Sequence, residues 1–190
     1  MDRIETMLNE NLRLIDVAQY ERLSQQGEFD GERVELIRGR VVRMAAMGPL
    51  HGWAIQRLTM MLTESFGKVA DVRVQLPLYV SDDTMPQPDF ILVPKAPEPV
   101  GHPKKAYLVI EVAQSSLRFD RVVKAPLYAG GPAKEYWVVD LQARALEVYR
   151  KPKHGAYTER FRLHRDDAIA PLAFPKIEVA LREFLPKKSR

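Results

Sequence analysis

Residues 106–116 read AYLVIEVAQSS and place one carboxylate, that of Glu111, inside an apolar run. Side chains alternate between the two faces of a strand, and both faces of this segment are apolar. The pattern predicts a strand over 106–113 that is covered on both sides, with Glu111 enclosed. A buried carboxylate needs a cation or hydrogen-bond donors to compensate it.

A second acid precedes another apolar run. Residues 86–94 read PQPDFILVP, and Asp89 stands at the start of the predicted strand 89–93. If this strand pairs beside strand 106–113, Asp89 and Glu111 converge at one end of the sheet.

The segments before these strands have clear start and stop signals. Residues 16–26 suit a helix with Asp16 as its N-cap, which we expect to cap the sheet. Two strands are predicted at about 32–37 and 40–46, joined by a tight turn at Arg38–Gly39. Apolar residues at helical spacing predict a helix over 50–67 that packs on the sheet.

The rest of the chain alternates between strands and helices. After the two acidic segments we expect a helix over 115–131 that Pro126 kinks or interrupts. The other expected elements are an extended segment near 69–80, strands at 134–141, 145–151 and 157–163, and a closing helix at 178–185. The fold class is α/β (α+β), with a central mixed β-sheet flanked by helices.

Composition narrows the class of protein. The chain has 190 residues, 46% of them hydrophobic, which suits a single domain over residues 1–190. It has no cysteine, a net charge of +4 and a pI near 9.3, which fit a reducing cytoplasm and an anionic partner. The start of the chain is too charged for a signal peptide and no apolar run is long enough to cross a bilayer, so we expect neither a signal peptide nor a membrane partner.

The acids suggest a metal site. Glu35 from the predicted hairpin would join Asp89 and Glu111, so that three carboxylates face one point. Oxygen ligands of this kind favour Mg²⁺, with Mn²⁺ able to substitute. Asp120, Lys124 and Tyr128 are four residues apart on one helical face, so Lys124 can reach over the acids. A lysine beside a metal can orient water and stabilise charge on a phosphate, which indicates phosphodiester hydrolysis.

An ordered set of segments resembles the Uma-two family, whose members are assigned to the restriction endonuclease-like PD-(D/E)XK fold. The resemblance covers roughly residues 17–185. The segments that carry it are VELIRGRVVRM, GPLHGWAIQRL, PQPDFILV, YLVIEVAQSSLRFDRVVKAPLYA and KEYWVVDLQARALEVYR.

The resemblance implies roles for particular residues. Asp89 of the proline-aspartate pair and Glu111 of the E-V strand would be metal ligands, and Val112 would add its backbone carbonyl. The lysine that such nucleases carry two residues after the glutamate is Ala113 here. Lys124 on the next helix would replace it.

Other positions match less directly. Glu35 matches the early acid of the family's hairpin and would complete the acidic shell. His51 matches the histidine that opens the first long helix. Asp120 and Gln114 are further candidates, although Gln114 stands where relatives often carry an acid or a serine.

Structural roles are the alternatives for the two central acids and the lysine. Asp89 could be an acid at a strand entry. Lys124 could be a solvated helix lysine. Glu111 could form a buried ion pair, and the candidate partners are Lys104, Lys105 and Arg121.

The remaining candidates have structural alternatives too. Glu35 could pair across the hairpin with Arg43. His51 could be a helix-start histidine packed beside Ile55 and Leu58. Several arginines could contact phosphates or simply solvate the surface; they are Arg38, Arg40, Arg43, Arg118 and Arg121.

Together these features predict a cytoplasmic, Mg²⁺-dependent DNA endonuclease, and analogy with related nucleases predicts a homodimer. The alternative is a catalytically inactive nucleic-acid-binding or assembly module on the same fold. A metal-dependent hydrolase of another phosphoester is a third candidate.

Overall fold

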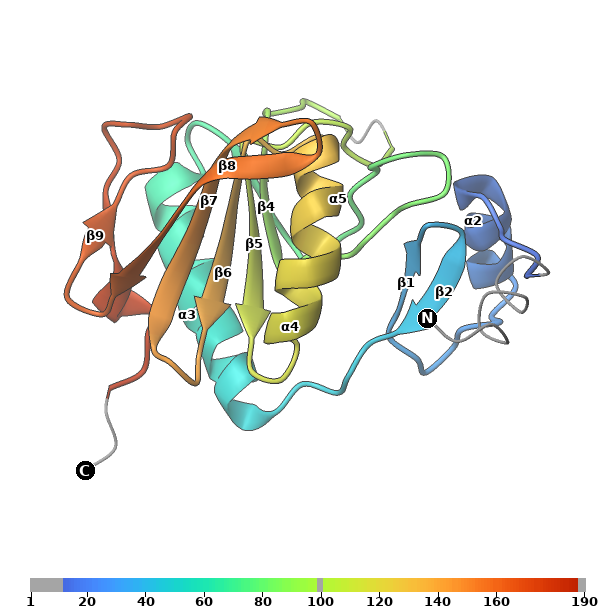
Figure 1. Ribbon diagram of the computed structural model, residues 1–190, viewed down its shortest axis with the longest axis horizontal. Coiled ribbons are helices and arrows are strands. Elements are labelled where there is room, and N and C mark those ends of the chain that lie inside the picture. Colours follow the sequence, from blue (N-terminus) through green and yellow to red (C-terminus); the bar gives the residue numbers. More distant parts are fainter. Residues whose placement is uncertain (1–11, 99–100, 188–190) are drawn as a thin grey trace.

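The computed structural model describes residues 12–98 and 101–187. Its centre is a 6-stranded sheet in the order β3-β4-β5-β6-β7-β8, which confirms the predicted central mixed sheet (Figure 1). The strands are β3 (Asp71–Val74), β4 (Phe90–Val93), β5 (Leu108–Ala113), β6 (Glu135–Asp140), β7 (Ala145–Lys153) and β8 (Ala156–His164). β4 lies antiparallel beside β5, as the acidic segments required.

The only parallel pair among the described strands of this sheet, β5 and β6, is joined by a helical crossover. The crossover runs through α4 (Leu117–Phe119), a π-helical turn η1 (Asp120–Lys124) and α5 (Ala125–Gly130). Pro126 has no N–H to donate to the preceding turn. The π turn accommodates the proline. In it the amide of Ala125 donates to the carbonyl of Asp120, and the helix continues past Pro126.

Helices cover both faces of the sheet (Figure 1). Helix α3 (Pro49–Phe66) packs its apolar stripe against one face, where Leu108, Ile110 and Val112 of β5 project. The crossover helices cover the other face, where Val109 and Ala113 meet Tyr128. Glu111 alternates with the first set, so its side chain projects toward the crossover helices.

The N-terminal elements form a separate unit beside the crossover helices (Figure 1). Strands β1 (Val34–Ile37) and β2 (Arg40–Arg43) pair as a 2-stranded hairpin outside the central sheet. Arg38 and Gly39 both have positive φ, which a tight turn of this type requires.

Helix α2 (Val17–Gln25) starts at Asp16, whose side chain accepts the amide of Gln19 as predicted. Its expected place on the sheet is wrong. Val17 packs with Leu36 and Met85 in a cluster on the hairpin, because the hairpin presents its own apolar face.

The C-terminal part corrects another prediction. Residues 178–185 do not form a single helix: β10 (Val179–Ala180) pairs with β9 (Ala168–Ile169), and the 3₁₀ turn η2 (Leu181–Glu183) follows. The apolar spacing of this segment instead buries Leu181 and Phe184 against the α3 face.

The helices of residues 12–98 and 101–187 include none with the length and apolar content of a membrane span. The charged residues 1–11 lie outside the described ranges.

Candidate functional site

Asp89 lies beside Glu111 at the junction of β4 and β5. The register pairs Phe90 with Ile110, which places Asp89 opposite the acid on the neighbouring strand. The backbone amide of Val112 donates to its Oδ2 at 2.8 Å, and the Nε2 amide of Gln75 donates to its Oδ1 at 3.2 Å. Burial acts to raise the pKa of Asp89, but contacts with His51, Val112 and Gln75 outweigh it and lower the pKa.

Glu111 lies under the crossover helix. Its Oε1 accepts hydrogen bonds from Nζ of Lys124 and from the hydroxyl of Tyr128, both at 2.8 Å. Lys124 is 1% exposed, so it is not a solvated helix lysine. The predicted helical face is confirmed, because Asp120, Lys124 and Tyr128 are all buried on the side that faces the sheet.

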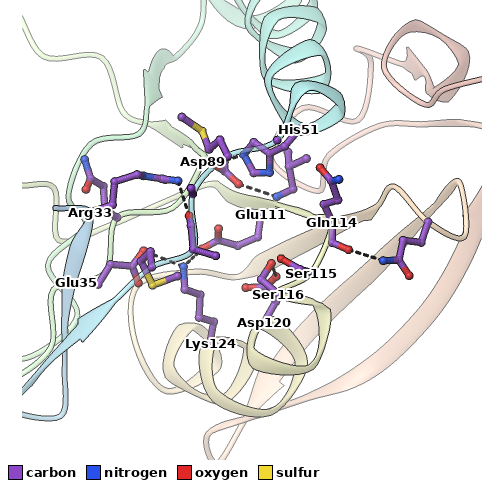
Figure 2. A pocket seen from close by; sticks show the side chains of 18 residues that line it. Arg33, Glu35, His51, Asp89, Glu111, Gln114, Ser115, Ser116, Asp120 and Lys124 are labelled. Atoms are coloured by element: carbon purple, nitrogen blue, oxygen red, sulfur yellow. Dashed lines mark hydrogen bonds and ion pairs between the residues drawn. The ribbon is translucent and has the colours of Figure 1, made fainter. Parts of the chain in front are cut away.

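Glu35 reaches the same lysine from the hairpin. Its Oε1 lies 3.0 Å from Nζ of Lys124, so one ammonium group joins two carboxylates from distant segments (Figure 2). The alternative partner, Arg43, pairs with Glu32 instead. Glu111 therefore does form a buried ion pair, but its cation is Lys124 and none of the expected partners Lys104, Lys105 and Arg121.

Asp120 is a fourth buried acid at the site. It accepts a hydrogen bond from the hydroxyl of Ser116 at 2.7 Å. Burial is the main cause that raises the pKa of Asp120 to about 6, and Lys124 and Ser116 only partly oppose it. Near neutral pH this group is therefore close to its titration range.

These side chains line a cavity of about 290 Å³ at the carboxyl end of β5 (Figure 2). The hairpin borders the cavity on one side, and the start of α3 borders it on another. His51 points into it from α3, with Nε2 3.4 Å from Oδ1 of Asp89. Arg33 and Gln114 stand on its walls.

Unpartnered polar atoms gather on this cavity. In the described part of the chain, the buried side-chain polar atoms without a hydrogen bond are Oε2 of Glu35, Oε1 of Gln114 and Nε2 of His51, of which Nε2 has only the 3.4 Å contact with Asp89. All three residues line the cavity. Buried polar atoms are normally satisfied, so a cluster of exceptions in one cavity indicates a place where a ligand or ordered water binds.

The charges at the site do not balance. Four acids, Glu35, Asp89, Glu111 and Asp120, line the cavity with only two cationic side chains, Lys124 and Arg33. Burial acts to lower the pKa of Lys124, but attraction to the acids raises it overall, so the lysine is charged. Burial is the largest cause that raises the pKa of Glu111 well above its usual value, and the neighbouring acids add to it. The site therefore favours an added cation or proton.

The donor set suits a hard divalent cation. Asp89 and Glu111 carry carboxylate oxygens, and Val112 next to Glu111 carries a backbone carbonyl, which are ligand types that such a cation could use. The expected convergence of three carboxylates on one point is not seen: across residues 12–98 and 101–187, no three His, Asp or Glu side chains are grouped to hold a metal. Glu35 and Glu111 instead both bind the ammonium group of Lys124, while Asp89 binds Val112 and Gln75.

Two residues that contact the acids were not predicted as site residues. Tyr128 was recognised on the face of Lys124, and that spacing could have identified it as a donor to Glu111. Gln75 contacts Asp89 from the end of β3 with a positive φ. No local signal marks it, because its place depends on the pairing of β3 with β4. Arg121, a candidate partner of Glu111, binds Glu147 instead.

Comparison with known proteins agrees with this architecture. The crystal structure of "a putative nuclease belonging to DUF820" from Anabaena variabilis ATCC 29413 is similar in fold, with a TM-score of 0.66 and 14% sequence identity. The similarity covers 80% of this chain and 89% of that chain. No curated protein matches the sequence.

A family model covers most of the chain. The Uma2 model, described as "Putative restriction endonuclease", matches residues 17–182. These residues include Asp89, Glu111, Lys124 and the hairpin that carries Glu35. The chain therefore belongs to the Uma2 family of restriction endonuclease-like proteins.

Proposed function

We propose that this protein is a divalent-metal-dependent DNA endonuclease whose active site is the cavity between the hairpin, α3 and the crossover helix. One observation carries the proposal: the excess of buried carboxylates and the unpartnered polar atoms share a single cavity at the end of β5. Family membership supports a nucleic-acid substrate.

Asp89, Glu111 and the carbonyl of Val112 would hold the cation. Bound Mg²⁺ or Mn²⁺ would supply a more acidic water and neutralise charge on the scissile phosphate. The amide of Val112 fixes the orientation of Asp89 through Oδ2, at 2.8 Å. Gln75 fixes its other oxygen, so the carboxylate is positioned before substrate arrives.

Lys124 would bring positive charge to the reacting phosphate and orient the attacking water. Its ammonium group has three donors, and two of them are directed to Glu111 and Glu35. Glu35 would hold the lysine in place, which makes it a positioning residue. The reaction is hydrolysis: a water oxygen bonds to phosphorus, one phosphorus–oxygen ester bond breaks, and the leaving oxygen gains a proton.

Cleavage of supercoiled plasmid with Mg²⁺ or Mn²⁺ tests the proposal. Wild type should nick the plasmid, and Asp89→Asn and Glu111→Gln should reduce the rate by about 100-fold or more, because loss of even an outer-shell partner of a metal ligand typically costs roughly 10–100-fold. Glu64→Gln on the exposed side of α3 is a matched control and should cut normally. The proposal is wrong if wild type cuts no DNA, or if Asp89→Asn cuts as fast as wild type.

A second candidate function is a nucleic-acid-binding module without catalysis. The observation that favours it is the closed pairing of Lys124 with two acids, together with Ala113 at the usual lysine position. Calorimetric titration with Mn²⁺ separates the two functions. Binding that disappears in Asp89→Asn supports the enzyme, and no binding by wild type supports the module.

Cutting both strands of a duplex requires two sites. A homodimer would supply them by symmetry, and we propose this state for the active enzyme. Sedimentation of the protein with and without duplex DNA measures it directly.

A further inference from the structure

A second charged cluster lies on the same face of the sheet as Glu111, across the crossover helix. Its centre is Glu147 on β7, which is 2% exposed. Arg121 donates to both oxygens of Glu147, Arg160 donates to Oε2 at 2.9 Å and Arg162 donates to Oε1 at 2.6 Å. The hydroxyl of Tyr149 adds a bond to Oε2 at 2.8 Å.

The carboxylate of Glu147 is charged and fully bonded. Burial acts to raise its pKa, but hydrogen bonds from Arg121, Arg162 and Tyr149 and the charge of Arg160 lower it to about 2. Asp140 is the second acid of the cluster, 3.7 Å from Arg162 and 4.0 Å from Arg121. Three guanidinium groups therefore face two carboxylates, which leaves a surplus positive charge.

Neutralising Glu147 does not require three arginines. Arg121 alone binds it through two nitrogens, which is the strong bidentate geometry. Arg160 and Arg162 each use only Nη2, and within the described residues their other N–H groups make no hydrogen bond. Their side chains are 51% and 42% exposed, so these donors face solvent.

The arginines are held in fixed positions around a recess. Arg160 stacks on the ring of Tyr149, with its guanidinium carbon 4.9 Å from the ring centre. A recess of about 270 Å³ is lined by Arg121, Glu147, Arg160, Phe161 and Arg162. Arginines whose rotamers are already fixed lose less entropy when they bind an anion.

The recess is in register with the proposed active site. Across the sheet, Glu111 pairs with Val138, Val138 with Glu147, and Glu147 with Arg162. At about 4.8 Å per strand, Glu147 lies roughly 10 Å and Arg162 roughly 14 Å from Glu111. A separation of this size is within the span of a few nucleotides of one strand.

We propose that Arg121, Arg160 and Arg162 form a subsite for a backbone phosphate of the nucleic acid, a few nucleotides from the bond that is cut. This inference rests on the proposed function, because it names where the same substrate is held. The subsite positions the backbone and reads no base. Glu147 is its positioning residue, since it fixes all three guanidinium groups.

Binding of a fluorescent DNA duplex in the presence of chelator tests the subsite without catalysis. The test variant is Arg160→Ala/Arg162→Ala. The matched control is Arg57→Ala/Arg182→Ala, because these two arginines also share one glutamate, Glu183, near α3 on the other face of the sheet. Melting temperatures are measured for each protein.

The test variant should bind DNA roughly 10-fold more weakly at low salt, and the slope of log K against log salt should fall by about 2. The control should keep wild-type affinity and slope. If the double variant does not fold, Arg160→Ala alone is used, because Arg160 makes a single hydrogen bond to Glu147. For that variant the slope should fall by about 1.

Unchanged affinity and slope in the folded test variant overturn the subsite, as does an equal loss in the control. A titration with inorganic phosphate distinguishes the source of the anion. If free phosphate binds wild type and not the variant while DNA binding is unchanged, the recess is a free-phosphate site and the proposal is wrong. Plasmid cleavage is measured separately, so a wild type that binds DNA through these arginines without cutting it contradicts only the proposed function.

Discussion

Nζ of Lys124 lies 2.8 Å from Oε1 of Glu111, and both side chains are almost completely buried. This contact joins the central strand of the sheet to the π turn of the crossover helix. Glu35 extends it to the hairpin. One buried ammonium group thus connects three elements, and removing it should be costly.

Lys124→Met should destabilise the protein by about 3–5 kcal/mol near pH 8, because it leaves carboxylates buried without their cation. Glu111 has a raised pKa in the folded protein. Such a group gives stability that is present below the unfolded pKa and lost as pH rises through the folded pKa. At pH 5 Glu111 is more often protonated and needs no cation, so the stability lost in Lys124→Met should be smaller there. Urea unfolding at both pH values measures it, with exposed Lys68→Met as the control; equal losses at the two pH values would contradict the raised pKa of Glu111.

Asp120→Asn should remove a fall in stability between pH 4 and pH 7. The pKa of Asp120 rises from 3.8 to about 6 on folding, so wild type loses stability as pH increases through this window. A pKa shift of this size corresponds to at most about 3 kcal/mol in the free energy of unfolding. Relative to wild type, the variant should gain stability as pH rises, measured by urea unfolding in chelator. A difference that does not vary with pH would show that Asp120 ionises normally.

Tyr128→Phe removes the hydroxyl that donates to Glu111 and leaves the ring in place. Loss of a hydrogen bond to a buried carboxylate should cost about 1.5–3 kcal/mol. Tyr107→Phe is the control, because in the described part of the chain the Tyr107 ring packs on Phe174 and its hydroxyl has no hydrogen bond. Chemical denaturation compares the two variants, and equal stabilities would argue against a stabilising hydrogen bond from Tyr128 to Glu111.

Glu147→Gln should be less stable than wild type at pH 7 by about 2–3 kcal/mol, because it weakens bonds from three arginines. The pKa of Glu147 is lowered from 4.5 to about 2. Its contribution is therefore present above pH 4.5 and lost as pH falls toward 2. Acid titration of both proteins should show their stabilities converging below pH 4.5. Glu159→Gln on the neighbouring strand should change stability far less, since Glu159 binds only the exposed Lys151 in the described residues.

Local patterns in the sequence were sufficient for most of the elements. Alternation and apolar content predicted β4 and β5, and the four-residue spacing placed Lys124 on the face that meets Glu111. The closing helix was wrong because short apolar segments suit either a helix or a strand, and pairing with β9 decided the outcome.

The sequence by itself determined that Glu111 is buried, because a carboxylate inside an apolar run is enclosed when both faces of its strand are covered. The burial of Asp120 and Glu147 depends on the tertiary structure. Only the tertiary structure decided which cation forms an ion pair with each acid. Lys124 and Glu35 are 89 residues apart, and Arg121 turns to Glu147 rather than to Glu111. Contacts between residues so far apart in the sequence depend on strand register and helix placement, which no local spacing encodes.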